Sequence, residues 1–182
     1  MKKKLSLVLL IVVMVSGLVT GVAIAGGWGG SWGHGSLIFT GYFAGVGNTD
    51  VDIKLTATGT VLAQCQNNGG NIAPGRSPVT VNLTETSTWS TDENGRADGM
   101  VETEPPTISN TPPSPNSKDD GCPSNSWTVV GYDARTTDYQ TANLLVTAQD
   151  DPSQVYFDLD FTCDTTHDAN GFITDVDCTY VP

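Results

Sequence analysis

Four cysteines are the residues of this chain whose chemistry can be predicted most directly. They are Cys65, Cys122, Cys163 and Cys178. In an exported chain an even number of cysteines indicates disulfides, and four cysteines allow three pairings. The dipeptide Asn170-Gly171 is a strong signal for a two-residue hairpin loop. A loop there makes Ala169 face Phe172 and puts Cys163 opposite Cys178, in a hydrogen-bonded pair with Cα atoms about 5.5 Å apart.

The second disulfide follows by elimination and joins Cys65 to Cys122. The alternative is one metal site built from the four thiolates, because Zn²⁺ binds sets of four cysteines. The chain has no C-x-x-C pair, and an exported protein meets an oxidising environment. We therefore expect two disulfides and no metal at the cysteines.

The first 25 residues predict export. Lys2, Lys3 and Lys4 precede an apolar run over residues 5–22, and Ala23-Ile24-Ala25 has the small-residue pattern of a signal-peptidase site. Cleavage would fall before Gly26 and release a secreted or cell-surface protein. The alternative is an uncleaved anchor, since residues 5–25 are long enough to span a bilayer. No later stretch is apolar over a membrane length, so the mature chain is expected to have no membrane span.

The mature chain is strongly acidic. It keeps five basic residues against the 20 acidic ones, a formal net charge of −15. Such a chain repels nucleic acid and anionic lipid, so phosphate-backbone binding is excluded as its main role.

Five aspartates near the C-terminus are the candidate cation ligands. They are Asp158, Asp160, Asp164, Asp175 and Asp177. They alternate with apolar residues and so share the outer face of two predicted strands, with Asp164 opposite Asp177. Like charges in such positions either extend into water or are bridged by Ca²⁺; we expect the solvated face and no cofactor, and keep Ca²⁺ as the alternative. The stretch 92–99 resembles a calcium loop, but its spacing departs from the EF-hand pattern, and Asn94-Gly95 predicts a hairpin turn instead.

Catalytic residues are poorly represented. The two histidines are His34, in a glycine-rich segment, and His167, near the predicted hairpin loop, where it faces Thr174 and lies close to Asp164 and Asp168. The chain contains neither G-x-S-x-G nor H-E-x-x-H. We therefore expect no catalytic residue and no enzymatic activity.

The apolar pattern predicts an all-β protein. Val51, Ile53 and Leu55 alternate with polar residues, as do Phe157, Leu159 and Phe161, which is the period of a half-buried strand. Nine strands are predicted, near residues 36–45, 49–58, 60–67, 78–88, 96–103, 127–134, 143–149, 154–164 and 172–181. This number of short strands is typical of an antiparallel β-sandwich, and an immunoglobulin-like layout is compatible with it.

Two segments fall outside this pattern. Residues 103–126 hold six of the ten prolines, which prevents a central strand, so we interpret them as a crossover between the sheets of a single domain, 36–182, rather than a linker. Residues 26–35 read GGWGGSWGHG and predict a flexible lead. Trp28 and Trp32 either contact a surface or a second chain, or fold back onto the domain.

Three further segments have distinctive motifs: Gly47-Asn48-Thr49-Asp50-Val51, the run CQNNGGNIAPG over residues 65–75, and the run CPSNSW over residues 122–127. Together they resemble the motifs of a set of uncharacterised secreted bacterial β-proteins. A final pair of cysteine-bearing strands adds to this resemblance. It implies export and a disulfide-linked β domain, without an activity.

The resulting functional prediction is a secreted, non-enzymatic structural or surface- and matrix-associated β domain, able to attach or self-associate through residues 26–35. The alternative is an extracellular binding module for a carbohydrate or another cell-surface ligand. That alternative needs exposed aromatic side chains, for which the candidates are Trp89, Tyr132, Tyr139 and Tyr156. A hydrolase, the third hypothesis, requires an acidic pocket.

Overall fold

A computed structural model describes residues 26–34 and 36–182, which form eight β-strands. The strands are β1 (Gly27–Gly33), β2 (Ile38–Ala44), β3 (Val51–Gln66), β4 (Ile72–Trp89), β5 (Arg96–Glu102), β6 (Thr128–Ala148), β7 (Val155–His167) and β8 (Ile173–Val181). The predicted signal peptide, residues 1–25, lies outside the described part. Within that part no helix is long and apolar enough to cross a membrane.

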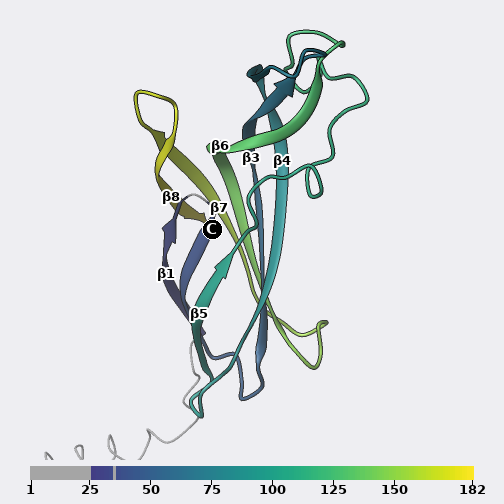
Figure 1. Ribbon diagram of the computed structural model, residues 1–182. Coiled ribbons are helices and arrows are strands. Elements are labelled where there is room, and N and C mark those ends of the chain that lie inside the picture. The colour runs from purple at the N-terminus through teal and green to yellow at the C-terminus, as the bar shows by residue number, and fades with distance from the viewer. Residues whose placement is uncertain (1–25, 35) are drawn as a thin grey trace, which may run out of the picture.

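The strands form two antiparallel sheets that pack together, as predicted (Figure 1). The small sheet has the order β1-β2-β5 and the large sheet the order β4-β3-β6-β7-β8. An immunoglobulin constant-type sandwich places its strands in the orders 1-2-5-4 and 3-6-7. The present order differs from it, because the fourth strand lies in the second sheet and an eighth strand follows the seventh.

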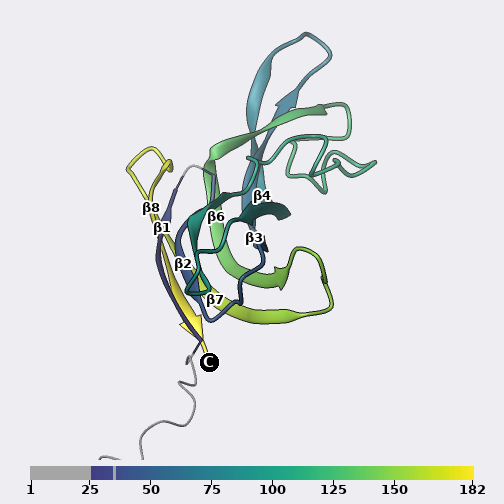
Figure 2. The same ribbon diagram turned by 90° about the horizontal axis from the view of Figure 1, so that it is seen from below.

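The two sheets differ greatly in length. Strands of the small sheet have 7 residues, whereas β3, β4 and β6 have 16, 18 and 21. The small sheet therefore covers only one half of the large sheet. Residues 103–127 connect β5 of the small sheet to β6 of the large one and run beside β4 on the way to the far end (Figures 1 and 2).

The core of the sandwiched half is built on aromatic rings. Phe39 and Trp89 stack with ring centroids 6.4 Å apart, and Phe43 packs 5.7 Å from Trp89. The rings reach the backbone of the small sheet because a row of glycines, Gly30, Gly41 and Gly99, crosses its three strands in register. A Cβ at Gly99 would lie 2.7 Å from the Trp89 indole, and one at Gly30 would lie 2.6 Å from the Phe39 ring.

The prediction of a flexible lead at residues 26–35 is wrong for Gly27–Gly33, which is strand β1 and pairs with β2 along its whole length. Trp28 packs with ring centroids 5.4 Å from Phe161, and Trp32 packs 5.0 Å from the same ring. Glycine density argued against order locally, but the two indoles lie on the inner face and pack against the large sheet. Tertiary packing outweighs the weak strand propensity of glycine here.

Two pairs of predicted strands are single long strands. Residues 51–66 continue through Gly59, where a Cβ would lie 3.1 Å from Tyr139 Cα, so glycine allows the close approach of β6. Residues 128–148 continue as β6 through an irregular stretch that the sequence pattern had suggested was a break.

Candidate functional site

Both predicted disulfides are present. Cys65–Cys122 and Cys163–Cys178 have Cα–Cα distances of 5.7 and 4.0 Å, and the described residues contain no free cysteine. The first bridge fastens the crossover to β3, and the Arg76 amide donates to the Gly121 carbonyl at 2.7 Å beside it. The far half of the large sheet is therefore held by a covalent link and a loop rather than by a second sheet.

The hairpin that carries the second bridge is not built as predicted. Its loop has three residues, because the Asp168 amide donates to the Phe172 carbonyl at 2.8 Å and Gly171 has φ of +80°. His167 therefore faces Ile173 and not Thr174, and Thr174 forms a bulge. The bulge restores the register, so Cys163 still faces Cys178. Their 4.0 Å Cα–Cα distance matches the non-hydrogen-bonded pair type, at about 4.5 Å, rather than the predicted hydrogen-bonded type.

The same loop occurs three times, beginning at Asn67, Asp92 and Asp168. In each loop the side chain of the first residue accepts two hydrogen bonds of 2.8–3.0 Å. The donors are the backbone N–H groups of the residues two and four positions later in the chain. Hydrogen bonds from Arg96 N–H and Phe172 N–H lower the pKa of Asp92 and of Asp168, respectively. These carboxylates are used to cap turns, which explains the stretch 92–99 without a cation.

The five candidate aspartates are distributed over the outer faces of β7 and β8. Asp164 faces Asp177 in register, as predicted. The Asn143 amide group donates to Asp158 at 2.7 Å and to Asp160 at 2.9 Å, which separates these two from the others. Among the residues that the structure describes, no three His, Cys, Asp or Glu side chains form a group that could hold a metal ion.

The aromatic candidates for a ligand platform lie mostly in the core, so this part of the prediction is wrong. Trp89, Tyr132 and Tyr139 are 4%, 9% and 1% exposed, and only Tyr156 is half-buried. His34 is exposed, and His167 lies with Nε2 3.2 Å from the Thr137 carbonyl oxygen. Aromatic residues in an alternating pattern face the core, and the sequence pattern alone did not distinguish them from a surface set.

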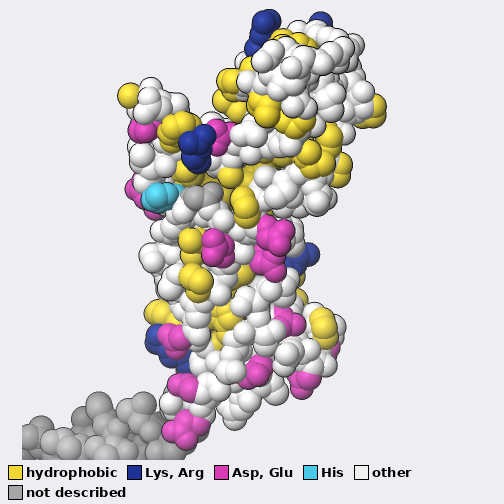
Figure 3. All heavy atoms as spheres, viewed as in Figure 1, with side chains coloured by type: hydrophobic (Ala, Val, Ile, Leu, Met, Phe, Trp, Pro, Cys, Tyr) yellow, Lys and Arg dark blue, Asp and Glu magenta, His cyan; other side chains and the backbone are white. Residues whose placement is uncertain are grey.

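The large sheet divides into a fork. β6 pairs with β3 from Thr128 to Ala148, but with β7 only from Thr141 to Thr147. Beyond that point β7 and β8 diverge from β3, β4 and β6, and Figures 1 and 3 show the notch between the two branches. At the base of the fork the Thr165 hydroxyl bonds the Tyr139 N–H at 2.9 Å and the Tyr139 carbonyl at 3.2 Å, in place of a backbone ladder.

The fork results from a bulge in β6. Thr60 pairs with Asp138 and Leu62 with Asp133, so one residue of β3 lies opposite residues 134–137 of β6. The Thr136 hydroxyl donates to the Asp133 carbonyl at 2.8 Å, and the Thr137 hydroxyl donates to the carbonyl of residue 134 at the same distance. Such local side-chain bonds compete with the sheet ladder, and they explain why the strand bends here.

The fork encloses a groove of about 370 Å³, which we call the fork groove. One wall comes from β3 and β4 and includes Leu62, Gln64 and Ile72; the other comes from the hairpin and includes Asn170 and Phe172. Asp133 and Thr136 of the bulge also line it. Ile72 is 61% exposed, so its apolar side chain is accessible at the wall of the groove.

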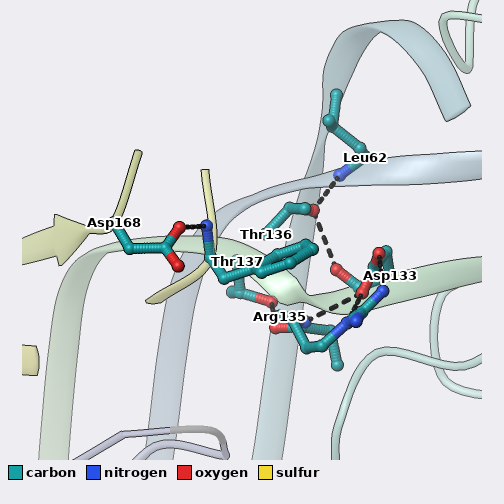
Figure 4. A network of polar contacts seen from close by, with 8 residues as sticks. Leu62, Asp133, Arg135, Thr136, Thr137 and Asp168 are labelled. Atoms are coloured by element: carbon teal, nitrogen blue, oxygen red, sulfur yellow. Dashed lines mark hydrogen bonds and ion pairs between the residues drawn. The ribbon is translucent and has the colours of Figure 1, made fainter. Parts of the chain in front are cut away.

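A polar network supports the groove at its base (Figure 4). Thr136 Oγ1 accepts from the Leu62 N–H at 3.1 Å, which ties the bulge to β3. Arg135 forms a two-bond ion pair with Asp133, at 2.8 and 2.7 Å, and lies 4.2 Å over the Phe172 ring. The Arg135 hydrogen bonds lower the pKa of Asp133, so this carboxylate is ionised and acts as an acceptor.

Sequence reasoning did not select Asp133, Arg135 or Phe172. A signal was present, since the run D-A-R-T-T in the middle of a strand holds side chains that bond locally and interrupt a ladder. What the groove offers is recognition: one aromatic ring, apolar walls, and amide and carboxylate groups. In comparisons with known proteins, no protein-family model, no curated protein and no solved structure matches this chain. The resemblance to secreted β-proteins therefore stays a prediction.

Proposed function

We propose that this protein is an exported, non-enzymatic module that binds a carbohydrate in the fork groove. Export rests on the predicted signal peptide and agrees with two disulfides, which persist in oxidising compartments. The single observation that carries the binding role is the groove itself, a concave site within the range of about 300–1,000 Å³ typical of small-molecule pockets.

The lining of the groove favours a carbohydrate over a purely apolar ligand. Gln64, Asn170 and Asp133 supply planar amide and carboxylate groups that can pair with neighbouring hydroxyls. Phe172 supplies an aromatic surface, and its stacking on Arg135 holds the ring in place before a ligand arrives. A preorganised site of this kind loses little entropy on binding.

The structural or matrix-associated role has less support. That hypothesis relied on residues 26–35 as an exposed adhesive tail, but Trp28 and Trp32 pack against Phe161 in the sandwich. Attachment at the cell surface is retained in the proposal, as the result of ligand binding.

A glycan array probed with the exported, disulfide-bonded chain tests the proposal. We expect a defined family of oligosaccharide hits, and Phe172→Ala should reduce their affinity about tenfold or more. Val155→Ala is the matched control, because Val155 is 52% exposed and does not line the groove. An array without hits, or hits that Phe172→Ala leaves unchanged, would contradict a carbohydrate site in the fork.

A further inference from the structure

A second groove lies where the two sheets meet at one side of the sandwich. β1 is an edge strand of the small sheet and β8 an edge strand of the large sheet, and both views in Figures 1 and 2 show them next to each other. Trp28, Trp32 and Phe161 line the groove from the core side, and residues 175–178 line it from β8. Its volume is about 440 Å³. We call it the edge groove.

The backbone of β8 presents unpaired groups to this groove. Cys163 and Cys178 form a non-hydrogen-bonded pair, as their 4.0 Å Cα–Cα distance indicates. In an antiparallel ladder the N–H and C=O of such a residue point away from its partner strand. Hydrogen-bonded and non-hydrogen-bonded pairs alternate along the β7–β8 ladder, so Val176, two residues before Cys178, is also in a non-hydrogen-bonded pair. The N–H and C=O of Val176 and of Cys178 therefore point to the open edge of β8. Both residues line the edge groove.

The charge of the groove is uniform. Asp175 and Asp177 line it, Asp164 faces Asp177 across the β7–β8 ladder, and none of the residues lining the groove is basic. All three carboxylates are exposed. A second copy of this chain would bring the same carboxylates to the same edge, so repulsion opposes edge-to-edge pairing of two copies. A basic partner removes that repulsion.

We propose that the edge groove binds an extended basic segment of a partner protein as an additional antiparallel strand on β8. Each strand pair in both sheets is antiparallel, and strand addition supplies backbone hydrogen bonds while side chains supply specificity. The central residue of the segment lies opposite Val176 and exchanges two backbone hydrogen bonds with it. This site is independent of the fork groove.

The register defines the sequence of the partner. The partner residues that lie opposite Asp175 and Asp177 project their side chains on the same outer face as those carboxylates. Both positions of the partner segment therefore require Lys or Arg. The central side chain projects inward, toward the two indoles and Phe161, so it is apolar. The recognised pattern is therefore basic–apolar–basic in an extended conformation.

The probe is a fluorescein-labelled peptide with the core Ser-Lys-Val-Lys-Ser, titrated with the exported, disulfide-bonded chain and followed by anisotropy. Asp175→Asn with Asp177→Asn should weaken binding about tenfold, and the same peptide with N-methylvaline at its centre should bind at least tenfold more weakly. The matched control is Glu85→Gln with Glu93→Gln, which makes the same charge change elsewhere, with Glu85 on the opposite edge strand β4. It should change the affinity less than twofold.

Charge reversal provides the second arm. The double variant Asp175→Lys with Asp177→Lys should no longer bind the lysine peptide and should instead bind the peptide Ser-Glu-Val-Glu-Ser. Equal binding of the N-methylated peptide would overturn the proposal, because it would mean charge attraction without strand addition. An equal loss in the Glu85 and Glu93 control would overturn it as well. Phe172→Ala should leave peptide binding unchanged, because Phe172 lines the fork groove and not the edge groove. The proposals for the two grooves are therefore tested independently.

Discussion

The two halves of the large sheet reach order by different means. In one half the small sheet packs on the large sheet, with Phe39 stacked on Trp89 of β4, Trp28 and Trp32 against Phe161 of β7, and a row of glycines making room for the rings. In the other half a loop and the Cys65–Cys122 bridge replace the second sheet, and β6 separates from β7. The first half is a closely packed sandwich, whereas the second leaves an open groove at its edge. This division is common in binding proteins, in which a packed scaffold positions irregular segments that contact the ligand.

The largest expected effect is in the sandwiched half. Phe39 is fully buried and contacts Trp32, Phe43 and Trp89. Phe39→Ala removes the centre of this cluster and should lower the free energy of unfolding by about 3–5 kcal/mol. Urea denaturation followed by tryptophan fluorescence measures the change. A loss below about 1 kcal/mol would mean that the ring cluster is not the main support of the fold.

A loss of nearly the same size is expected in the half covered by the crossover. The Cys65–Cys122 bridge spans a sequence separation of 57, for which the chain-entropy model gives about 4 kcal/mol. The double variant Cys65→Ala with Cys122→Ala should therefore be destabilised by up to about this amount. Hydrogen exchange should show faster opening of residues 60–66 and 128–133 than of residues 51–57, and uniform acceleration would contradict the division into two halves.

The bulge that opens the fork should give a smaller effect. Thr136→Val leaves the Leu62 N–H without its acceptor and should cost about 1–2 kcal/mol. The control is Thr58→Val on the outer face of β3, which removes a solvent-exposed hydrogen bond to Asn82 and is expected to change stability by less than about 0.5 kcal/mol. Chemical denaturation of both variants compares them directly, and equal effects would show that the bulge does not depend on this bond.

The smallest effect concerns acid stability. The pKa values of Asp92 and Asp168 are lowered by backbone hydrogen bonds in the folded state. Their stabilising contribution is therefore complete above the unfolded pKa of about 3.9 and is lost as the pH falls through the lower folded value. Asp92→Asn with Asp168→Asn keeps an acceptor, as Asn67 does in the third loop, and removes the titration.

The measurement is the urea midpoint at pH 6 and about pH 2.5. Wild type should lose more stability on acidification than the double variant, and Asn67→Asp should make the loss slightly steeper. Identical pH dependence in the three proteins would show that these carboxylates do not contribute to acid sensitivity.

Much of this protein follows from short-range sequence patterns. The period-two alternation of residues such as Val51, Ile53 and Leu55 identified strands, because a residue's face in a strand depends only on its neighbours. The same periodicity and a correctly located loop paired Cys163 with Cys178. The loop length was wrong, but the bulge at Thr174 compensated for the error.

Other features were decided by contacts between residues far apart in the chain. Gly27–Gly33 is a strand because Trp28 and Trp32 pack against Phe161, and no local propensity reports that contact. The fork and its groove depend on where β6 leaves β7 and on Arg135 stacking over Phe172. Local patterns specify which residues form strands and turns, whereas the positions of open edges and grooves depend on how the completed sheets meet.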